Sequence, residues 1–101
     1  EPPEIVRRPD GSWLVNGRAP VEQVIARLGL PPIPHAERGH YLTLAGLVLA
    51  RLGRIPHTGE TVEIGDFTVE IVDMDGRRID MVLIHRRVPP LTQGEGDGGS
   101  G

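Results

Sequence analysis

Histidines and carboxylates are the side chains of this 101-residue chain that could bind a metal ion. His35 and His40 share a loop with Glu37, and imidazole together with carboxylate can hold a divalent transition metal. Their spacing matches no recognised ligand pattern, however, and solvated loop histidines explain the same residues. His57 and His85 stand apart from this group. We therefore expect no metal site at the histidines.

Three aspartates, Asp73, Asp75 and Asp80, suggest a second chemistry, because Mg²⁺ prefers oxygen ligands and keeps several of its waters. Asp75 precedes Gly76 in a turn signal, and Asp80 lies in a segment of alternating, strand-like character. A turn residue and a solvated strand residue explain both without a ligand. We expect no magnesium site here either.

Nucleophilic catalysis has equally little support. The chain contains no cysteine, and the hydroxyls nearest to a motif, Ser12 and Thr43, have no obvious base. Gly11, Gly17 and Gly53 form no phosphate cradle, because no lysine–serine pair and no strand–glycine–helix fingerprint accompanies them. We therefore predict that the chain is not an enzyme, holds no catalytic residue and carries no cofactor.

Composition argues against nucleic acid as a partner. The net charge is −3, and the chain has one Trp, one Tyr and one Phe. Neither the basic footprint nor the stacking surface of a nucleic-acid binder is therefore indicated. The pairs Arg77-Arg78 and Arg86-Arg87 are interpreted as solvated strand ends, with docking to an acidic partner or a lipid headgroup as the alternative.

The element that says most about the fold is segment 43–53, TLAGLVLARLG, a predicted helix that is apolar on nearly every side. Thr43 is its expected N-cap and Gly53 its C-terminal stop, and Gly46 inside it indicates a close backbone approach. A helix with such a surface must be covered all round. A membrane span needs roughly 20 apolar residues. We therefore expect the rest of the chain or a partner to cover it, without membrane insertion.

Two smaller elements precede this helix. Segments 5–6 and 13–15 flank a turn signal at 9–12, PDGS, and are predicted to form a β-hairpin. Apolar residues recur on one helical face in 21–28, between Pro20 and Gly29, which predicts a first amphipathic helix.

The last third of the chain is predicted to be β-structure, because apolar and polar residues alternate on both sides of a tight turn at Asp75-Gly76. Six residues are expected to share one sheet face: Phe67, Val69, Ile71, Ile79, Met81 and Leu83. Three apolar residues fall on the other face and are the candidates for an interface with another chain or domain, internal cover being the alternative: Val72, Val82 and Ile84.

The predicted fold is therefore α+β, with two short helices packed on a small antiparallel sheet with β-hairpins. Residues 1–4 are expected to be a Pro-rich linker, residues 5–88 the folded domain, and residues 89–101 a disordered Gly-rich tail. The first residue is Glu, which favours a fragment cut from a longer protein.

The order of these elements resembles the transporter-associated domain of the CorC/HlyC family. The likeness covers roughly residues 5–87 and rests on five segments in the expected order: DGSWLVNGR at 10–18, TLAGLVL at 43–49, LGRIP at 52–56, GE at 59–60 and DGRRI at 75–79. In that family the domain is the C-terminal cytoplasmic piece of membrane proteins implicated in magnesium and cobalt efflux, some of them described as hemolysins. The loop 31–40 is less acidic here than the family pattern.

The resemblance implies a regulatory, non-catalytic domain on the cytoplasmic side of the inner membrane. Its partners would be the transmembrane and CBS domains of the same parent chain, and it would form a homodimer. It would adjust ion transport by interdomain packing and dimerisation. The alternative is a small-ligand module for a nucleotide or flavin, because the family's fold is related to a flavin-binding arrangement. The transported ion stays open.

Overall fold

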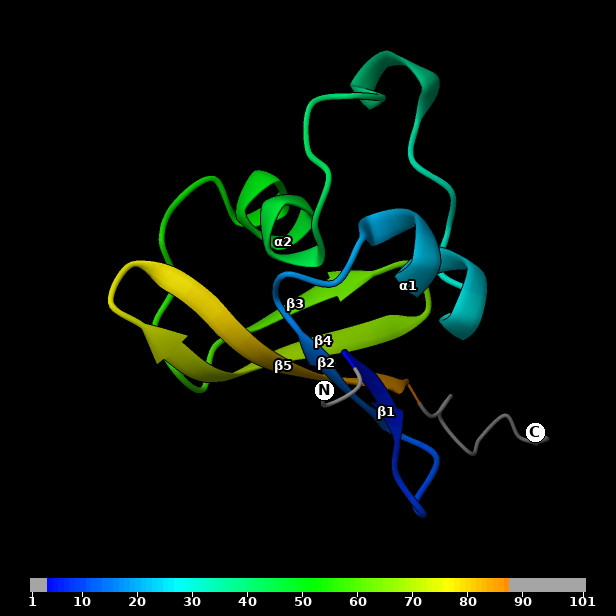
Figure 1. The fold of residues 1–101 in the computed structure, drawn as a ribbon, viewed down its shortest axis with the longest axis vertical. Helices are drawn as coiled ribbons and strands as arrows, with labels where there is room; N and C mark the ends of the chain where they lie inside the picture. The colour runs from blue at the N-terminus through cyan, green and yellow to red at the C-terminus, as the bar shows by residue number, and fades with distance from the viewer. Residues whose placement is uncertain (1–3, 88–101) are drawn as a thin grey trace, which may run out of the picture.

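Five strands and three helical elements make up the computed structural model, which describes residues 4–87 (Figure 1). In chain order they are β1 (Ile5–Arg7), β2 (Trp13–Asn16), α1 (Val21–Leu28), the 3-10 helix η1 (His35–Glu37), α2 (Leu44–Leu52), β3 (Thr61–Ile64), β4 (Phe67–Asp75) and β5 (Arg78–Arg86). The predicted tail at 89–101 and all of the predicted linker except Glu4 lie outside the described residues.

The strands form one antiparallel sheet in the order β1-β2-β5-β4-β3, so β1 and β3 are its edges among the described residues. Both helices lie on the same face of this sheet (Figure 1). The α+β prediction, with two short helices on an antiparallel sheet, is confirmed. The hairpin at 5–16 and the tight turn after Asp75 are confirmed as well, since Gly76 takes the positive φ of 63° that a two-residue turn requires.

The ends of α2 are those the sequence predicts. The Thr43 hydroxyl accepts a hydrogen bond from the Gly46 N–H at 3.1 Å, and Gly53 ends the helix in the left-handed conformation. A Cβ at Gly46 would lie 2.8 Å from the Tyr41 Cβ, which explains why glycine is kept inside the helix. The close approach therefore comes from the residues just before α2.

Backbone hydrogen bonds from the turn after β2 fix the first turn of α2. The Ala45 N–H donates to the Gly17 carbonyl at 2.9 Å, and the Leu44 N–H donates to the Ala19 carbonyl at 3.0 Å. These are N–H groups that a helix cannot satisfy internally. The turn thus replaces the water that would otherwise bind them.

The same turn is attached to β5. The Gly17 N–H donates to the Asp80 carbonyl at 3.0 Å, and a Cβ at Gly17 would lie 2.1 Å from the Ile79 carbonyl oxygen. Only a residue without a side chain fits between β5 and α2 at this point. Gly17 therefore joins the sheet and the second helix directly.

The core lies between the helices and the sheet, and it corrects the predicted sheet faces. Val82 and Ile84 are 0% exposed and sit in the core with Val69 and Ile71, which are their partners across β4 and β5. Assigning Val82 and Ile84 to an outer docking face is therefore wrong. Of the three interface candidates only Val72 is exposed, at 40%.

Two bulges explain the error. The pairing of β4 with β5 skips Val72 on one strand and Asp80 on the other, between the pairs Ile71–Val82 and Met74–Ile79. Each extra residue reverses the alternation of side chains along its strand. Ile79 therefore rejoins the core as predicted, whereas strict alternation from Ile79 would have turned Val82 outward.

Met81 and Leu83, which were predicted to share the core face, are only half-buried. Neither residue belongs to the core, because Val82 and Ile84 occupy the side of β5 that faces the helices. The face predictions for Met81 and Leu83 are therefore wrong as well. The cause is the same change of phase between the two bulges.

The cover of α2 is one-sided. Leu44, Leu47 and Val48 are buried against the core, whereas Leu49 is half-buried and Ala50 is exposed. Within residues 4–87, α2 is therefore covered on its inner side alone, and not all round as the sequence led us to expect.

The corrected faces predict unequal effects of two identical substitutions. Val82→Ala should lower the free energy of unfolding by about 2 kcal/mol, because it removes two buried methyl groups and leaves a cavity. Val72→Ala should change it by about 0.5 kcal/mol or less. Urea unfolding followed by circular dichroism measures both, and equal effects would contradict the assignment of faces.

Candidate functional site

The histidines and carboxylate of the 35–40 loop do not assemble into a ligand set. The Glu37 carboxylate instead accepts a hydrogen bond from the Tyr41 hydroxyl at 2.8 Å. Desolvation, and then this hydrogen bond, raise the pKa of Tyr41. Across residues 4–87, no three His, Asp or Glu side chains lie close enough together to hold a metal ion.

The three aspartates are distributed around the β4–β5 hairpin. Asp75 lies 3.4 Å from Arg78 across the turn, Asp73 pairs with Met81 in the bulged stretch, and Asp80 offers its backbone carbonyl to Gly17. Hairpin geometry thus explains their positions.

The two hydroxyls considered as nucleophiles have local structural roles. The Ser12 hydroxyl and the Ser12 N–H both donate to Oδ1 of Asp10, at 2.6 and 2.9 Å. These bonds, the side-chain one first, lower the pKa of Asp10. Thr43 caps α2. The turn from β2 to α1 contains one glycine, Gly17. Neither hydroxyl is within a catalytic arrangement of the described residues.

A charged cluster fastens the connection from α2 to β3. Nη1 and Nη2 of Arg54 both donate to the Glu60 carboxylate, which also accepts from the His57 backbone N–H at 2.5 Å. The hydrogen bonds from Arg54, and next the one from His57, lower the pKa of Glu60 to about 2. The cluster gives this loop a fixed shape and leaves Glu60 ionised over the physiological range.

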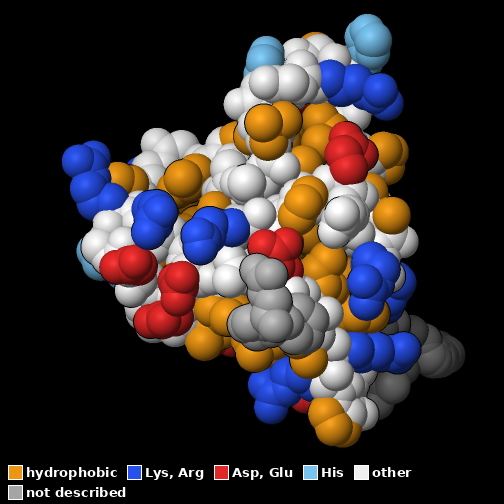
Figure 2. All heavy atoms as spheres, in the orientation of Figure 1, with side chains coloured by type: hydrophobic (Ala, Val, Ile, Leu, Met, Phe, Trp, Pro, Cys, Tyr) orange, Lys and Arg blue, Asp and Glu red, His pale blue; other side chains and the backbone are white. Residues whose placement is uncertain are grey.

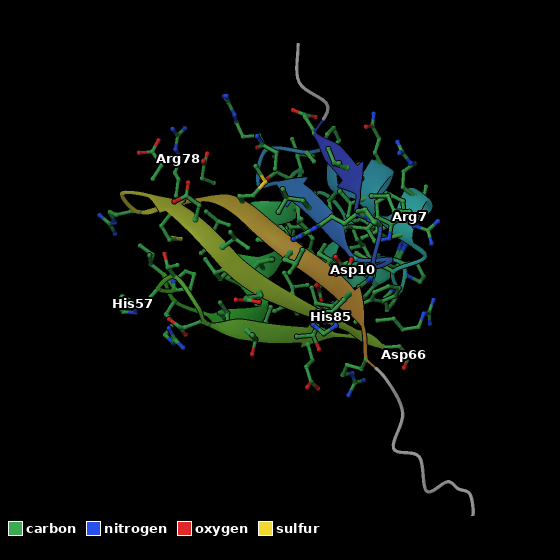
Figure 3. All side chains as sticks on the ribbon, turned by 90° about the horizontal axis from the view of Figure 1, so that it is seen from below. Arg7, Asp10, His57, Asp66, Arg78 and His85 are labelled. Atoms are coloured by element: carbon green, nitrogen blue, oxygen red, sulfur yellow. The ribbon has the colours of Figure 1, made fainter. Side chains whose placement is uncertain are left out.

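The sheet face opposite the helices is open within residues 4–87. Figure 3 views this face, with His85 on β5 and the helices behind the strands. Val6, Leu14 and Leu83 form one lateral row across β1, β2 and β5, and Val6 is 39% exposed. Val72 adds a further exposed apolar residue. An apolar row without internal cover is typical of a contact surface.

Two hollows flank the outer side of α2. A groove of about 740 Å³ separates α2 from the loop before it, and its apolar lining includes Leu49, Ala50 and Ile55. A smaller hollow of about 250 Å³ lies between α2 and the β4–β5 turn. Leu49 borders both. The sequence indicated an apolar helix, but it did not indicate which side would stay open.

The two basic pairs have different surroundings. Arg87 is 3.2 Å from Glu63 and donates to the Gly65 carbonyl, and Arg86 lies over the Phe67 ring. Arg77 and Arg78, by contrast, border the smaller hollow. In Figure 2, blue side chains gather beside red ones over the β4–β5 turn at the left.

Sequence reasoning missed the cluster around Trp13. The guanidinium groups of Arg7 and Arg27 lie 5.5 and 5.9 Å from the centre of its ring. Such cation–π contacts hold β1 and α1 to β2. The sequence feature that could have indicated this cluster is the single tryptophan in a chain rich in arginine.

These features define an α+β module with open contact surfaces and, within residues 4–87, no assembled catalytic or metal centre. Residues 6–88 match the CorC_HlyC family, described as a transporter associated domain, and the chain belongs to this family. This family is a transporter-associated one rather than a known catalytic one.

Curated relatives are much longer than the chain. The UPF0053 protein sll0260 of Synechocystis is 40% identical over 84 residues, which are 83% of this chain and 19% of the relative. The polyamine export protein of Escherichia coli K12 is 34% identical over 83 residues, 82% of this chain and 18% of the relative. The chain thus spans about a fifth of these proteins.

Solved structures share the fold. The CorC_HlyC domain of a Xylella fastidiosa Temecula1 hemolysin is 41% identical, with a TM-score of 0.72 over 85% of this chain and 98% of that one. The transporter associated domain from a CBS domain protein of Porphyromonas gingivalis is 28% identical, with a TM-score of 0.67 over 83% and 98%. Within residues 4–87, no helix has both the length and the apolar content to cross a membrane.

The Glu60 cluster predicts a pH dependence of stability. Because folding lowers the pKa of Glu60 from 4.5 to about 2, the ionised cluster stabilises the fold fully above about pH 5 and loses this effect as the pH falls toward 2. Glu60→Gln should therefore lower the urea midpoint at neutral pH, and the gap to the unmodified chain should shrink toward pH 2.

Glu70→Gln is the matched control, because Glu70 forms no ion pair within residues 4–87. We expect it to lower the midpoint less at neutral pH. A gap for Glu60→Gln that stayed constant between about pH 7 and 2 would contradict the role assigned to the carboxylate.

Proposed function

We propose that this chain is a non-catalytic accessory domain of a cation exporter, located on the cytoplasmic side of the cell membrane. The observation that carries the proposal is the match to the transporter associated family over residues 6–88, by a chain that spans about a fifth of its curated relatives. The remaining four fifths of such a protein leave room for the membrane domain that moves the ion.

The cargo is proposed as a class. The E. coli relative is named for polyamine export, and the family resemblance implies magnesium and cobalt efflux. Polyamines and these metal ions are all cations, and the chain spans only about a fifth of its curated relatives. We therefore assign selection of the cargo to the rest of the protein and regulation to this domain.

Regulation would work through contact. A domain outside the transport path can shift a transporter between two states only if it contacts those states differently. The open sheet face with Val6, Leu14, Leu83 and Val72 is a surface for a homodimer, and CBS domains are the proposed neighbours, as in the P. gingivalis relative. Leu14 and Leu83 are half-buried and would complete their burial in the dimer.

The alternative of a nucleotide or flavin site is not favoured. The turn from β2 to α1 contains one glycine, and the chain contains no lysine to hold a phosphate. The family that residues 6–88 match is described as a transporter associated domain.

A chimera tests the proposal. The matched segment of the E. coli polyamine export protein is replaced by residues 5–88, and growth in toxic polyamine is compared with strains carrying the intact protein and a version with the segment deleted. We expect the deletion to impair tolerance and the chimera to restore at least part of it. A deletion without any effect would count against an accessory role.

A second measurement tests the dimer. Sedimentation of the 101-residue chain should show a concentration-dependent dimer, and Val72→Glu should weaken it by about tenfold, because a buried unpaired charge is costly at an interface. Gln23→Glu, the same charge change on exposed α1, is the control. A monomer at all concentrations would argue against self-association.

A further inference from the structure

The outer side of α2 is open and built of small or apolar residues. Ala50 on α2 and Gly53 at its end both line the groove of about 740 Å³, and both are exposed. Gly46 lines the groove as well, but Tyr41 packs against it. Leu42, just before the helix, is 76% exposed, and Ile55, just after it, is 39% exposed. Small residues let another backbone come close, and the two flanking side chains supply apolar contact at either end.

The border of this surface is basic, although the chain as a whole carries −3. Five arginines line the two hollows: Arg18, Arg51, Arg54, Arg77 and Arg78. Three carboxylates line them: Glu37, Asp75 and Asp80. The excess positive charge is therefore concentrated around α2.

Most of the carboxylates on this border already have partners. Asp75 pairs with Arg78, and Glu37 accepts a hydrogen bond from Tyr41. Among the arginines, Arg54 is paired with Glu60. Arg18, Arg51 and Arg77 form no ion pair within residues 4–87, and Asp80 is the one lining carboxylate without a side-chain partner there. Desolvation raises the pKa of Tyr41, and Arg51 lies close enough to the Tyr41 hydroxyl to offset part of that rise. Within residues 4–87, the unpaired guanidinium groups of Arg18 and Arg77 thus outnumber one unpaired carboxylate.

We propose that the outer side of α2 binds an acidic amphipathic helix from another domain of the same protein. The inference rests on the proposed function, which supplies that domain. Apolar side chains of the bound helix would fill the groove along Ala50 and Gly53, and its carboxylates would meet Arg51 on one side and Arg18 and Arg77 on the other. This contact completes the burial of α2 that its sequence requires.

Other occupants fit less well. In a twofold contact of two copies through this surface, each copy would present its arginines to the arginines of the other, which is repulsive. An anionic lipid surface would meet the border arginines but also the negative charge of the rest of the chain. A separate acidic helix avoids both penalties.

Photocrosslinking in the chimera described above tests this proposal. A benzoylphenylalanine is placed at Ala50, or at Ala26 as the matched control, since Ala26 is also an exposed alanine on a helix but lies on α1. We expect the probe at Ala50, and not the one at Ala26, to link to a helix with Asp or Glu side chains in another domain of the same polypeptide. Mass spectrometry of the crosslinked peptides identifies the target.

Charge reversal supplies the second readout. Arg51→Glu should lower the yield of the Ala50 crosslink about two- to fivefold, as expected for a rim ion pair, and Arg8→Glu, an exposed arginine on the β1–β2 loop, should leave it unchanged. An Ala50 crosslink to lipid or to a second copy of the domain would overturn the proposal, and so would the lack of any crosslink. The crosslink is measured whether or not the chimera restores polyamine tolerance, so the two proposals fail separately.

Discussion

The placement of α2 depends on two backbone hydrogen bonds, from Leu44 to Ala19 and from Ala45 to Gly17. They satisfy N–H groups that every helix leaves free at its start, and they do so with a turn that is itself attached to β5 through Gly17. Because no side chain contributes to this junction, its geometry is insensitive to the surface residues of α2. The helix is therefore held firmly on its inner side while its outer side remains available.

The bulges at Val72 and Asp80 shape the other wall of the smaller hollow. A bulge bends a strand and increases its twist, and the β4–β5 hairpin in Figure 1 curves up beside α2 beyond this point. The bend brings Arg77 and Arg78 next to Arg18, about 60 positions away in the sequence, around one cavity. The two bulges thus bring together, around one hollow, arginines that lie far apart in the sequence.

Local signals predicted most of the elements. Thr43, Gly53 and Gly76 each act within a few residues, so their roles as cap, stop and turn follow from sequence alone. The faces of β5 did not follow, because the phase of alternation depends on two bulges that involve pairing across strands. The sequence also could not show which side of α2 stays open, because that depends on the positions of η1 and the β4–β5 hairpin in the fold.

The lengths of the edge strands bear on how this domain avoids pairing with strands of other molecules. β1 has three residues and β3 has four, and β1 is followed directly by Arg8 and Pro9. Short edges that end in charge or proline are poor templates for further strands. Growth of the sheet from molecule to molecule, the first step toward fibrils, is thereby discouraged. Association with other chains or domains then takes place through the faces of the domain and not through its strand edges. Such association can stop at a defined stoichiometry.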